Sequence, residues 1–295
     1  MVRFGATVLS ISKLSMIIDA HTHILPVEFS RDRSLVLAAD ATFAVLFGHG
    51  RAKTATAEEL IASMDAEGVA TSVAAGYGWT DPGIARQAND YALDAARRHP
   101  GKIIPFCSVN PLWGEAAARE VRRCAETGAR GIGELHPDTQ GFSMADRDAL
   151  GLLAPAMDAA RVFRLPVLIH CSEPVGHVYP GKGSFTPDRA LALAQAFPEN
   201  IFIFAHFGGG LPFYAQMPEV SDALRNVYFD SAAQPLLYRP HVYASAAAGA
   251  GNEKVLFGSD YPRLSQGRAI RAVRAAGLGP AVEAAVLGGN AARLL

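Results

Sequence analysis

Short hydrophobic runs rich in β-branched residues alternate with amphipathic stretches from Met16 to the last residue. Continuous apolar runs are typical of parallel strands buried on both faces, while apolar residues three or four positions apart predict helices. The pattern predicts eight strands, at 16–21, 69–75, 102–109, 129–135, 166–170, 201–206, 227–232 and 254–260. It predicts helices at 57–67, 83–99, 114–127, 145–164, 187–197, 211–225, 239–250, 265–277 and 279–293.

The alternation of strand and helix predicts an α/β protein, because such units join parallel strands by right-handed crossovers. Eight units predict a single-domain (β/α)8 TIM barrel, a fold that needs about 250 of the 295 residues. An open doubly wound sheet is the alternative, but the first strand lacks the glycine-rich phosphate turn of that fold. The segment 24–56 is longer than an ordinary loop and predicts an insertion at the barrel mouth. We expect the barrel domain to span 16–295 and residues 1–15 to be a dispensable N-terminal extension.

The composition of the chain argues against two classes of binding partner, nucleic acids and membranes. A formal net charge of −1 gives no basic excess for binding nucleic acid, and no run of about 18 apolar residues predicts a membrane span. Three cysteines cannot all pair and none lies in a C-x-x-C spacing, which favours a reducing compartment, the cytoplasm. We therefore expect a small-molecule substrate, with a homo-oligomer left open.

Polar residues follow most of the predicted strands. The carboxyl ends of barrel strands meet at one rim, where polar residues are typical of an active site. A single histidine there is usually structural, but the convergence of several imidazoles and carboxylates predicts a metal site. Asp19 should share the face of the first strand with His21 and His23, as an outer hydrogen-bond acceptor. The candidate rim residues are His21, His23, Glu134, His170, His206 and Asp260.

Five motifs occur in a fixed order along the chain: H-T-H at 21–23, IHCSEP at 169–174, FAHFGGGLP at 204–212, FGSDYPR at 257–263 and LGGNAARLL at 287–295. Together they resemble the amidohydrolase superfamily, and more closely its amidohydrolase-2 branch, which includes the aminocarboxymuconate-semialdehyde decarboxylase type. The resemblance implies a metal-dependent barrel with the ligands His21, His23, His170 and Asp260. It also implies an acid/base role for His206, and a role for Asp260 in moving the proton of an attacking water.

Glu134, in the sequence GIGEL, departs from the decarboxylase type. In superfamily branches with two metals, a carboxylate at the end of the fourth strand often bridges the ions. One or two divalent ions per chain are therefore open, with zinc as the first expectation and manganese or iron as alternatives. If Glu134 bridges, His206 is a ligand of the second ion, and otherwise it is an acid/base group. Alternatively, Glu134 only orients a ligand histidine.

These features predict a metal-dependent hydrolase, in which metal-bound hydroxide attacks an amide, ester or lactone carbon. Asp260 and His206 would be the catalytic residues. One alternative is a mononuclear, metal-dependent, non-oxidative decarboxylase of an unsaturated or aromatic acid, and another is a non-catalytic binding barrel. Arg239 and Arg263, on loops after the last two strands, are candidates for binding a substrate carboxylate. His136 is expected either at the mouth of the site or in solvent.

Overall fold

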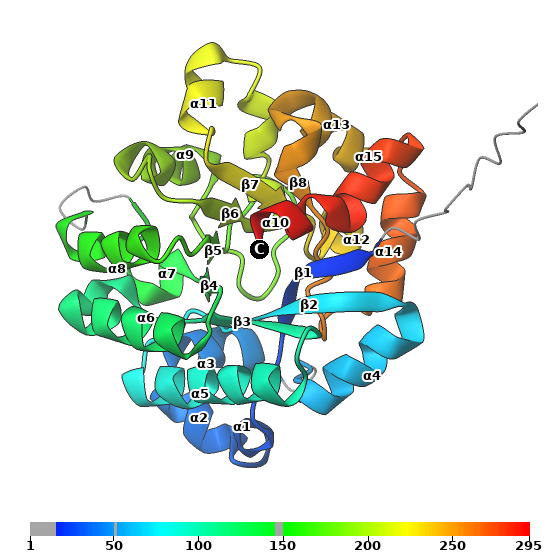
Figure 1. Cartoon of the computed structure of the whole chain (residues 1–295). Helices are drawn as coiled ribbons and strands as arrows, with labels where there is room; N and C mark the ends of the chain where they lie inside the picture. Colours follow the sequence, from blue (N-terminus) through cyan, green and yellow to red (C-terminus); the bar gives the residue numbers. More distant parts are fainter. Residues whose placement is uncertain (1–15, 50–51, 145–149) are drawn as a thin grey trace, which may run out of the picture.

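The computed structural model describes residues 16–49, 52–144 and 150–295. The extension expected at 1–15, and the start of the helix expected at 145–164, lie outside these residues. Eight parallel strands pair in sequence order and confirm the predicted barrel (Figure 1). The strands are β1 (Ile17–His23), β2 (Val69–Ala75), β3 (Ile103–Cys107), β4 (Gly131–Leu135), β5 (Val167–Ile169), β6 (Phe202–Phe204), β7 (Val227–Asp230) and β8 (Val255–Leu256).

Backbone hydrogen bonds bring the first and last strands together. The segment that follows β8 runs beside β1, and three bonds join the two: Ala20 N to Phe257 O (2.8 Å), Asp260 N to His21 O (3.0 Å) and His23 N to Tyr261 O (2.8 Å). The same bonds place Asp260 beside the two histidines of β1. The hydrogen bonds that close the barrel therefore also position the side chains at its rim.

Helices surround the strands in the order that the sequence predicts (Figure 1). The single helix expected at 211–225 is divided into a 3-10 turn, Leu211–Tyr214, and the short helix α11 (Pro218–Ala223). Pro218 has no amide hydrogen, so it cannot make the backbone bond that would join the two into one helix. The last predicted helix is divided into α15 (Pro280–Ala284), a π turn and α16 (Ala291–Leu294). The other outer helices are α4 (Ala57–Glu67), α5 (Pro82–Arg98), α6 (Glu115–Thr127), α8 (Leu150–Val162), α9 (Pro187–Ala196), α11 (Pro218–Ala223), α13 (Val242–Ala250) and α14 (Gln266–Arg274). Short helices α7 (Pro137–Gln140), α10 (Ala205–Gly208) and α12 (Gln234–Leu237) follow β4, β6 and β7.

The insertion at 24–56 forms three short helices with a hydrophobic cluster of their own. These are α1 (Val27–Arg31), α2 (Arg33–Ala39) and α3 (Ala41–Phe47). Phe29 and Phe43 pack against Trp79, which lies in the loop after β2. The Asp40 carboxylate caps α3 through Phe43 N (2.8 Å) and also accepts from Thr80 N (2.6 Å) and Asp81 N (2.9 Å). The insertion is thus fixed to the mouth of the barrel by both apolar and polar contacts.

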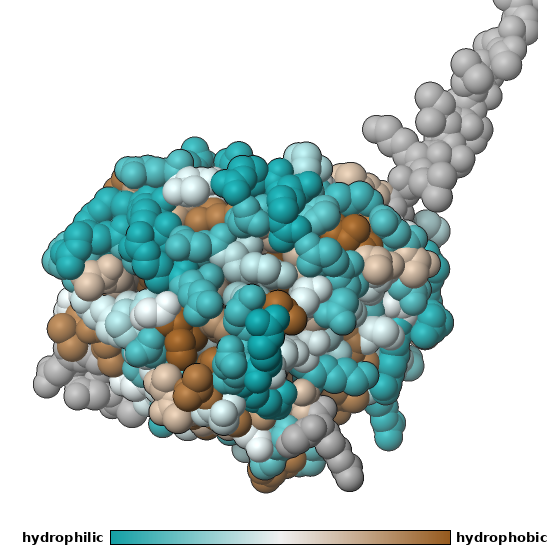
Figure 2. Space-filling view, turned by 90° about the horizontal axis from the view of Figure 1, so that it is seen from below, coloured by the Kyte–Doolittle hydropathy of each residue, from teal (hydrophilic) through white to brown (hydrophobic). Residues whose placement is uncertain are grey.

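Inward-facing apolar side chains fill the barrel between its two ends. Ile18, Val73, Phe106 and Leu168 belong to this core, and Ala291 of α16 joins it from the amino-terminal end of the strands. Accordingly, the C terminus lies near the barrel axis in Figure 1. No described helix is both long and apolar enough to cross a membrane. On the face seen in Figure 2, hydrophobic residues are scattered among hydrophilic ones.

Gly131 leaves room for the Phe106 ring inside the barrel, since a Cβ at this position would overlap the ring. We expect Gly131→Ala to lower the free energy of unfolding by about 1–3 kcal/mol through overpacking. The control is Gly151→Ala, at an exposed position of helix α8 where nothing lies near the added methyl group. This change should be neutral or slightly stabilising. Denaturant unfolding followed by circular dichroism measures both, and equal stabilities of the two variants would contradict the packing.

Candidate active site

β1 brings His21 and His23 to the rim through a register shift. Asp19 pairs with Ser72 of β2 but Thr22 pairs with Ala74, so β1 contains one extra residue between them, as in a β-bulge. The imidazoles of His21 and His23 meet with their Nε2 atoms 3.1 Å apart. Asp19 instead accepts hydrogen bonds from Ser259 N (2.9 Å) and Gln266 Nε2 (2.9 Å). The expectation that Asp19 shares the histidines' face is wrong, because the bulge interrupts the alternation of side chains.

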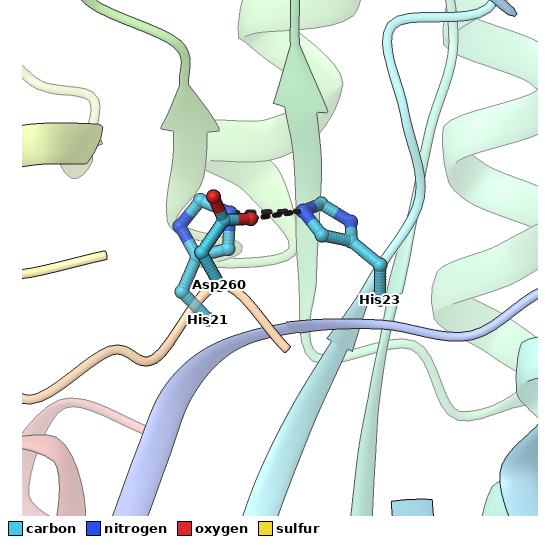
Figure 3. Close-up of side chains that lie close together, drawn as sticks. All are labelled: His21, His23 and Asp260. Atoms are coloured by element: carbon cyan, nitrogen blue, oxygen red, sulfur yellow. Dashed lines mark hydrogen bonds and ion pairs between the residues drawn. The ribbon is translucent and has the colours of Figure 1, made fainter. Parts of the chain in front are cut away.

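A first group of candidate ligands consists of His21, His23 and Asp260 (Figure 3). His23 Nε2 lies 3.5 Å from Asp260 Oδ1. The other ring nitrogens face acceptors: His21 Nδ1 lies 2.8 Å from Asp230 Oδ2, and His23 Nδ1 lies 3.1 Å from Ala75 O. Each Nδ1 must therefore donate, so that a cation replacing the proton on Nε2 would meet the lone pairs of both rings in the same space.

A second group consists of Glu134, His170 and His206. Glu134 Oε1 lies 3.0 Å from His170 Nδ1 and 3.6 Å from His206 Nε2, and the two nitrogens lie 3.1 Å apart. His206 Nδ1 donates to Ala232 O (2.9 Å), so its Nε2 also faces the group. All six predicted rim residues are buried, and the structure brings all of them together.

Glu134 belongs to the second group and also contacts the histidines of the first. Its Oε2 is 3.5 Å from His21 Nε2 and 3.6 Å from His23 Nε2, and His136 Nε2 approaches it to 3.3 Å. Backbone bonds between Gly76 and the 133–134 segment (2.9 and 2.8 Å) fix its place. Burial opposes ionisation of Glu134, but the neighbouring imidazoles of His21 and His136 hold its pKa well below the usual value. The carboxylate is therefore ionised.

The donor set fits a divalent cation. Burial lowers the pKa of His21 and His206, but nearby carboxylates outweigh it and raise the pKa of His21 well above its usual value and that of His206 to about 9. This shows a negative potential that a cation can satisfy in place of protons. Burial and the neighbouring His136 lower the pKa of His170 to about 4, which keeps that imidazole neutral. Converging imidazole nitrogens and carboxylate oxygens are the ligands that transition metals prefer.

The two groups lie at the floor of a pocket of about 530 Å³, a volume suited to a small-molecule ligand, and all of their residues except His21 line it. Its walls are mostly apolar and come from the insertion, the loop after β5 and α12. Arg263 lines the pocket, with its Nε 4.0 Å from Asp260 Oδ2, whereas Arg239 is exposed and lies outside it. His136, which was expected either at the mouth of the site or in solvent, also lines the pocket. The apolar and aromatic wall residues are Leu46, Phe47, Ala52, Tyr77, Tyr179, Pro180, Ala233, Leu236 and Leu237, and the polar residues His49, Lys53 and His177 line the pocket beside them.

The sequence analysis missed three residues of the site. Asp230 ends β7 and binds His21, so the rule applied to the other strand ends would have found it. Tyr77 stacks on His23 with ring centroids 4.1 Å apart, and Lys53 of the insertion lines the pocket. No pattern in the sequence places these last two at the site, because both lie in irregular segments. Cys171 is buried, and burial raises the pKa of its thiol well above the usual value, so it is unsuited to nucleophilic attack.

Comparisons with known proteins agree on one family. The model of the family described as Amidohydrolase (Amidohydro_2) matches residues 18–295. A curated relative, gamma-resorcylate decarboxylase of Polaromonas sp. strain JS666, is 23% identical over 220 residues. That alignment covers 60% of this chain and 65% of the relative, which is just under two thirds of the relative's length.

Solved structures with the same fold include two decarboxylases. The 5-carboxyvanillate decarboxylase LigW of Sphingomonas paucimobilis is 19% identical, with a TM-score of 0.74 over 95% of this chain and 98% of that one. The dihydroxybenzoic acid decarboxylase of Polaromonas sp. JS666, solved with manganese and the inhibitor 2-nitroresorcinol, is 17% identical. Its TM-score is 0.68 over 95% of this chain and 97% of that one.

The prediction of a hydrolase as the main activity is wrong. The curated relative is a decarboxylase, and the named activities among these structural neighbours are decarboxylations of aromatic acids. The error has a physical reason, because one set of imidazoles and carboxylates can serve both reactions. The structure brings together two groups of side chains that could hold a divalent metal, as expected. A similar decarboxylase was solved with manganese, and nothing supports zinc in particular.

Asp230 supports both ligand groups, since its Oδ2 faces His21 Nδ1 while its Oδ1 accepts from His206 N (3.1 Å) and Ala232 N (2.9 Å). Asn presents an acceptor to only one of these sides. We expect Asp230→Asn to weaken manganese binding about 10- to 100-fold, as measured by calorimetry on metal-depleted protein. The control is Asp158→Asn on the exposed face of α8, where the aspartate pairs with Arg161 and with no other described residue. Wild-type affinity in Asp230→Asn would show that Asp230 does not support the ligands.

Proposed function

The chain belongs to the amidohydrolase family, and we propose that it is a metal-dependent, non-oxidative decarboxylase of a small aromatic or unsaturated carboxylic acid. The observation that carries the proposal is the pocket, in which apolar and aromatic walls stand over a floor of imidazoles and carboxylates. A planar acid fits this arrangement, with its ring between the walls and its carboxylate on the floor. The activities of the similar decarboxylases support the same choice.

His21, His23 and Asp260 would hold one divalent ion. When bound, the ion supplies positive charge that orients an acidic substrate and polarises its oxygens. Manganese is the first metal to test, because a similar decarboxylase was solved with it, and zinc and iron follow. Cytoplasmic location and oligomeric state stay predictions.

The second group would handle the proton. In the reaction the bond between the carbon and its carboxylate breaks, CO2 leaves, and the electron pair left on carbon takes a proton. His206 is the proposed donor, since Ala232 O fixes its Nδ1 and its Nε2 faces the floor. The charge of Glu134, 3.6 Å away, stabilises the protonated imidazole. Solvent then returns the proton to His206.

The pocket walls would bind and orient the substrate. Phe47 meets Tyr77 edge to face with ring centroids 5.1 Å apart, and Tyr77 itself stacks on His23, so an aromatic surface continues from the mouth to the floor. Lys53 and Arg263 lie in the pocket lining and attract an anionic substrate. Arg239, being exposed and outside the pocket, has no part in this proposal.

The activity is tested by incubating the manganese-loaded protein with hydroxybenzoates and unsaturated acids in D2O. We expect CO2 release and a product with one deuterium on the carbon that lost the carboxylate, as detected by mass spectrometry. His206→Asn should lower kcat about 100-fold or more, the usual contribution of a general acid, and should retain the ion. Chelated protein is the control. A panel that yields no CO2 from any acid would refute the proposal.

Glu134→Gln tests whether the first group alone holds the metal ion while the second group handles the proton. If one ion is bound by His21, His23 and Asp260, the variant should keep one equivalent of manganese, as measured by inductively coupled plasma mass spectrometry. Its kcat should fall about 10- to 100-fold. Loss of a second equivalent relative to wild type would show that Glu134 bridges two ions. His206 would then be a metal ligand, and the assignment of the proton donor would have to change.

A further inference from the structure

Glu173 does not line the pocket but contacts Tyr179, which does. It follows β5 in the loop that contributes His177, Tyr179 and Pro180 to the pocket lining. Its Oε2 accepts a hydrogen bond from Tyr179 Oη (2.9 Å). Although the residue is only partly buried, its Oε1 is shielded from solvent and has no hydrogen-bond partner among the described residues. A shielded carboxylate oxygen without a donor is costly and calls for a partner.

Tyr238 is the candidate donor to this oxygen, because its hydroxyl interacts with the Glu173 carboxylate. It directly follows α12, whose Leu236 and Leu237 also line the pocket. Its hydroxyl is also buried without a hydrogen-bond partner in the described part of the chain. Burial, followed by the negative charge of Glu173, raises the pKa of both Tyr179 and Tyr238 above the usual value, so both hydroxyls keep the proton that they would donate.

Other contacts fix the loop after β5, but among the described residues no hydrogen bond joins it to α12. Asp138 of α7 accepts from Ser184 N (2.9 Å) and Phe185 N (3.1 Å). Lys182 Nζ closes the loop internally by donating to Val175 O (2.6 Å) and His177 O (3.0 Å). Gly181 packs on the insertion, where an added Cβ would lie 2.8 Å from Leu46 Cδ2. These contacts shape the loop and hold it to α3 and α7, but none ties it to α12. Glu173 is therefore placed to set the gap between the two walls.

We propose that Glu173 is a positioning residue that determines substrate specificity, by holding two tyrosines on a single carboxylate: Tyr179, which lines the pocket, and Tyr238, which directly follows the wall helix α12. The gap that it fixes would admit a flat single-ring acid and disfavour wider, fused-ring acids. The identity of these substrates rests on the proposed function, whereas the link between the walls does not. Loss of the link widens the gap without removing any group from the floor.

The link is tested by hydrogen–deuterium exchange of the manganese-loaded protein. Glu173→Ala removes both acceptors, Glu173→Gln keeps one, and Tyr238→Phe removes one donor. We expect all three to speed exchange in 173–182 and in α12, with Glu173→Ala fastest, while β1 and β5 are unchanged. Tyr214→Phe is the matched control, since this tyrosine is exposed and lies outside the pocket. Should Glu173→Ala fail to fold, the other two variants test the same link.

The specificity role is tested on the same variants with 2,6-dihydroxybenzoate and 1-hydroxy-2-naphthoate. The preference of kcat/KM for the single-ring acid should fall about tenfold in Glu173→Ala, the equivalent of one hydrogen bond to a charged group. The fall should arise in KM, with kcat and manganese content near wild type. Unchanged exchange would overturn the link, and faster exchange with an unchanged preference would overturn the specificity role. Failure of wild type on every acid would refute the proposed activity, while the exchange experiment would still test the link.

Discussion

One buried carboxylate organises the mouth of this barrel. Glu134 is 3% exposed, and five imidazoles approach its oxygens to between 3.0 and 3.6 Å. An ionised carboxylate without partners at this depth would be strongly destabilising, so the fold must bring compensating groups to it. These groups come from the ends of β1, β4, β5 and β6, which the closed barrel delivers to one rim. The position of Glu134 therefore links the topology of the sheet to the chemistry of the pocket.

The backbone is strained where the functional side chains leave the sheet. His206 and Asp260 adopt φ angles of 57° and 66°, which residues with a Cβ rarely occupy. Each such conformation costs about 1–2 kcal/mol, and packing of the surrounding structure must offset this cost. The bulge in β1 has a related effect, since it breaks regular pairing and turns His21 and His23 onto the same floor. The site is thus formed by local departures from a regular barrel that the apolar core tolerates.

The sequence was sufficient to predict the regular part of the molecule. Continuous apolar runs located all eight strands, and the polar residues that follow them located the six residues on the floor, because strand ends in a parallel barrel must converge. Asp19 was misplaced, since a bulge depends on pairing with β2 and leaves no periodic signal. Tyr77 and Lys53 were missed for a similar reason, because irregular loops reach the pocket by tertiary packing alone. The reaction was wrongly predicted, because the floor residues are compatible with both hydrolysis and decarboxylation.

What separates these two reactions is the surroundings of the floor rather than the floor itself. Attack by water requires a water molecule held beside the substrate, whereas loss of CO2 requires that the carboxylate be held out of solvent and that one proton be delivered to carbon. Walls built from Phe47, Tyr77 and Tyr179 favour the second requirement, and they come from three different segments, namely α3 and the loops after β2 and β5. Carboxylates connect these segments at the barrel mouth. Asp40 joins the insertion to the loop after β2, and Glu173 is placed to do the same for the loops after β5 and β7. Because an ionised carboxylate can accept several hydrogen bonds but donates none, it suits this task better than any neutral side chain. In the proposed reaction, chemistry and specificity would therefore depend on acidic residues of two kinds, those on the floor and those that hold the walls around it.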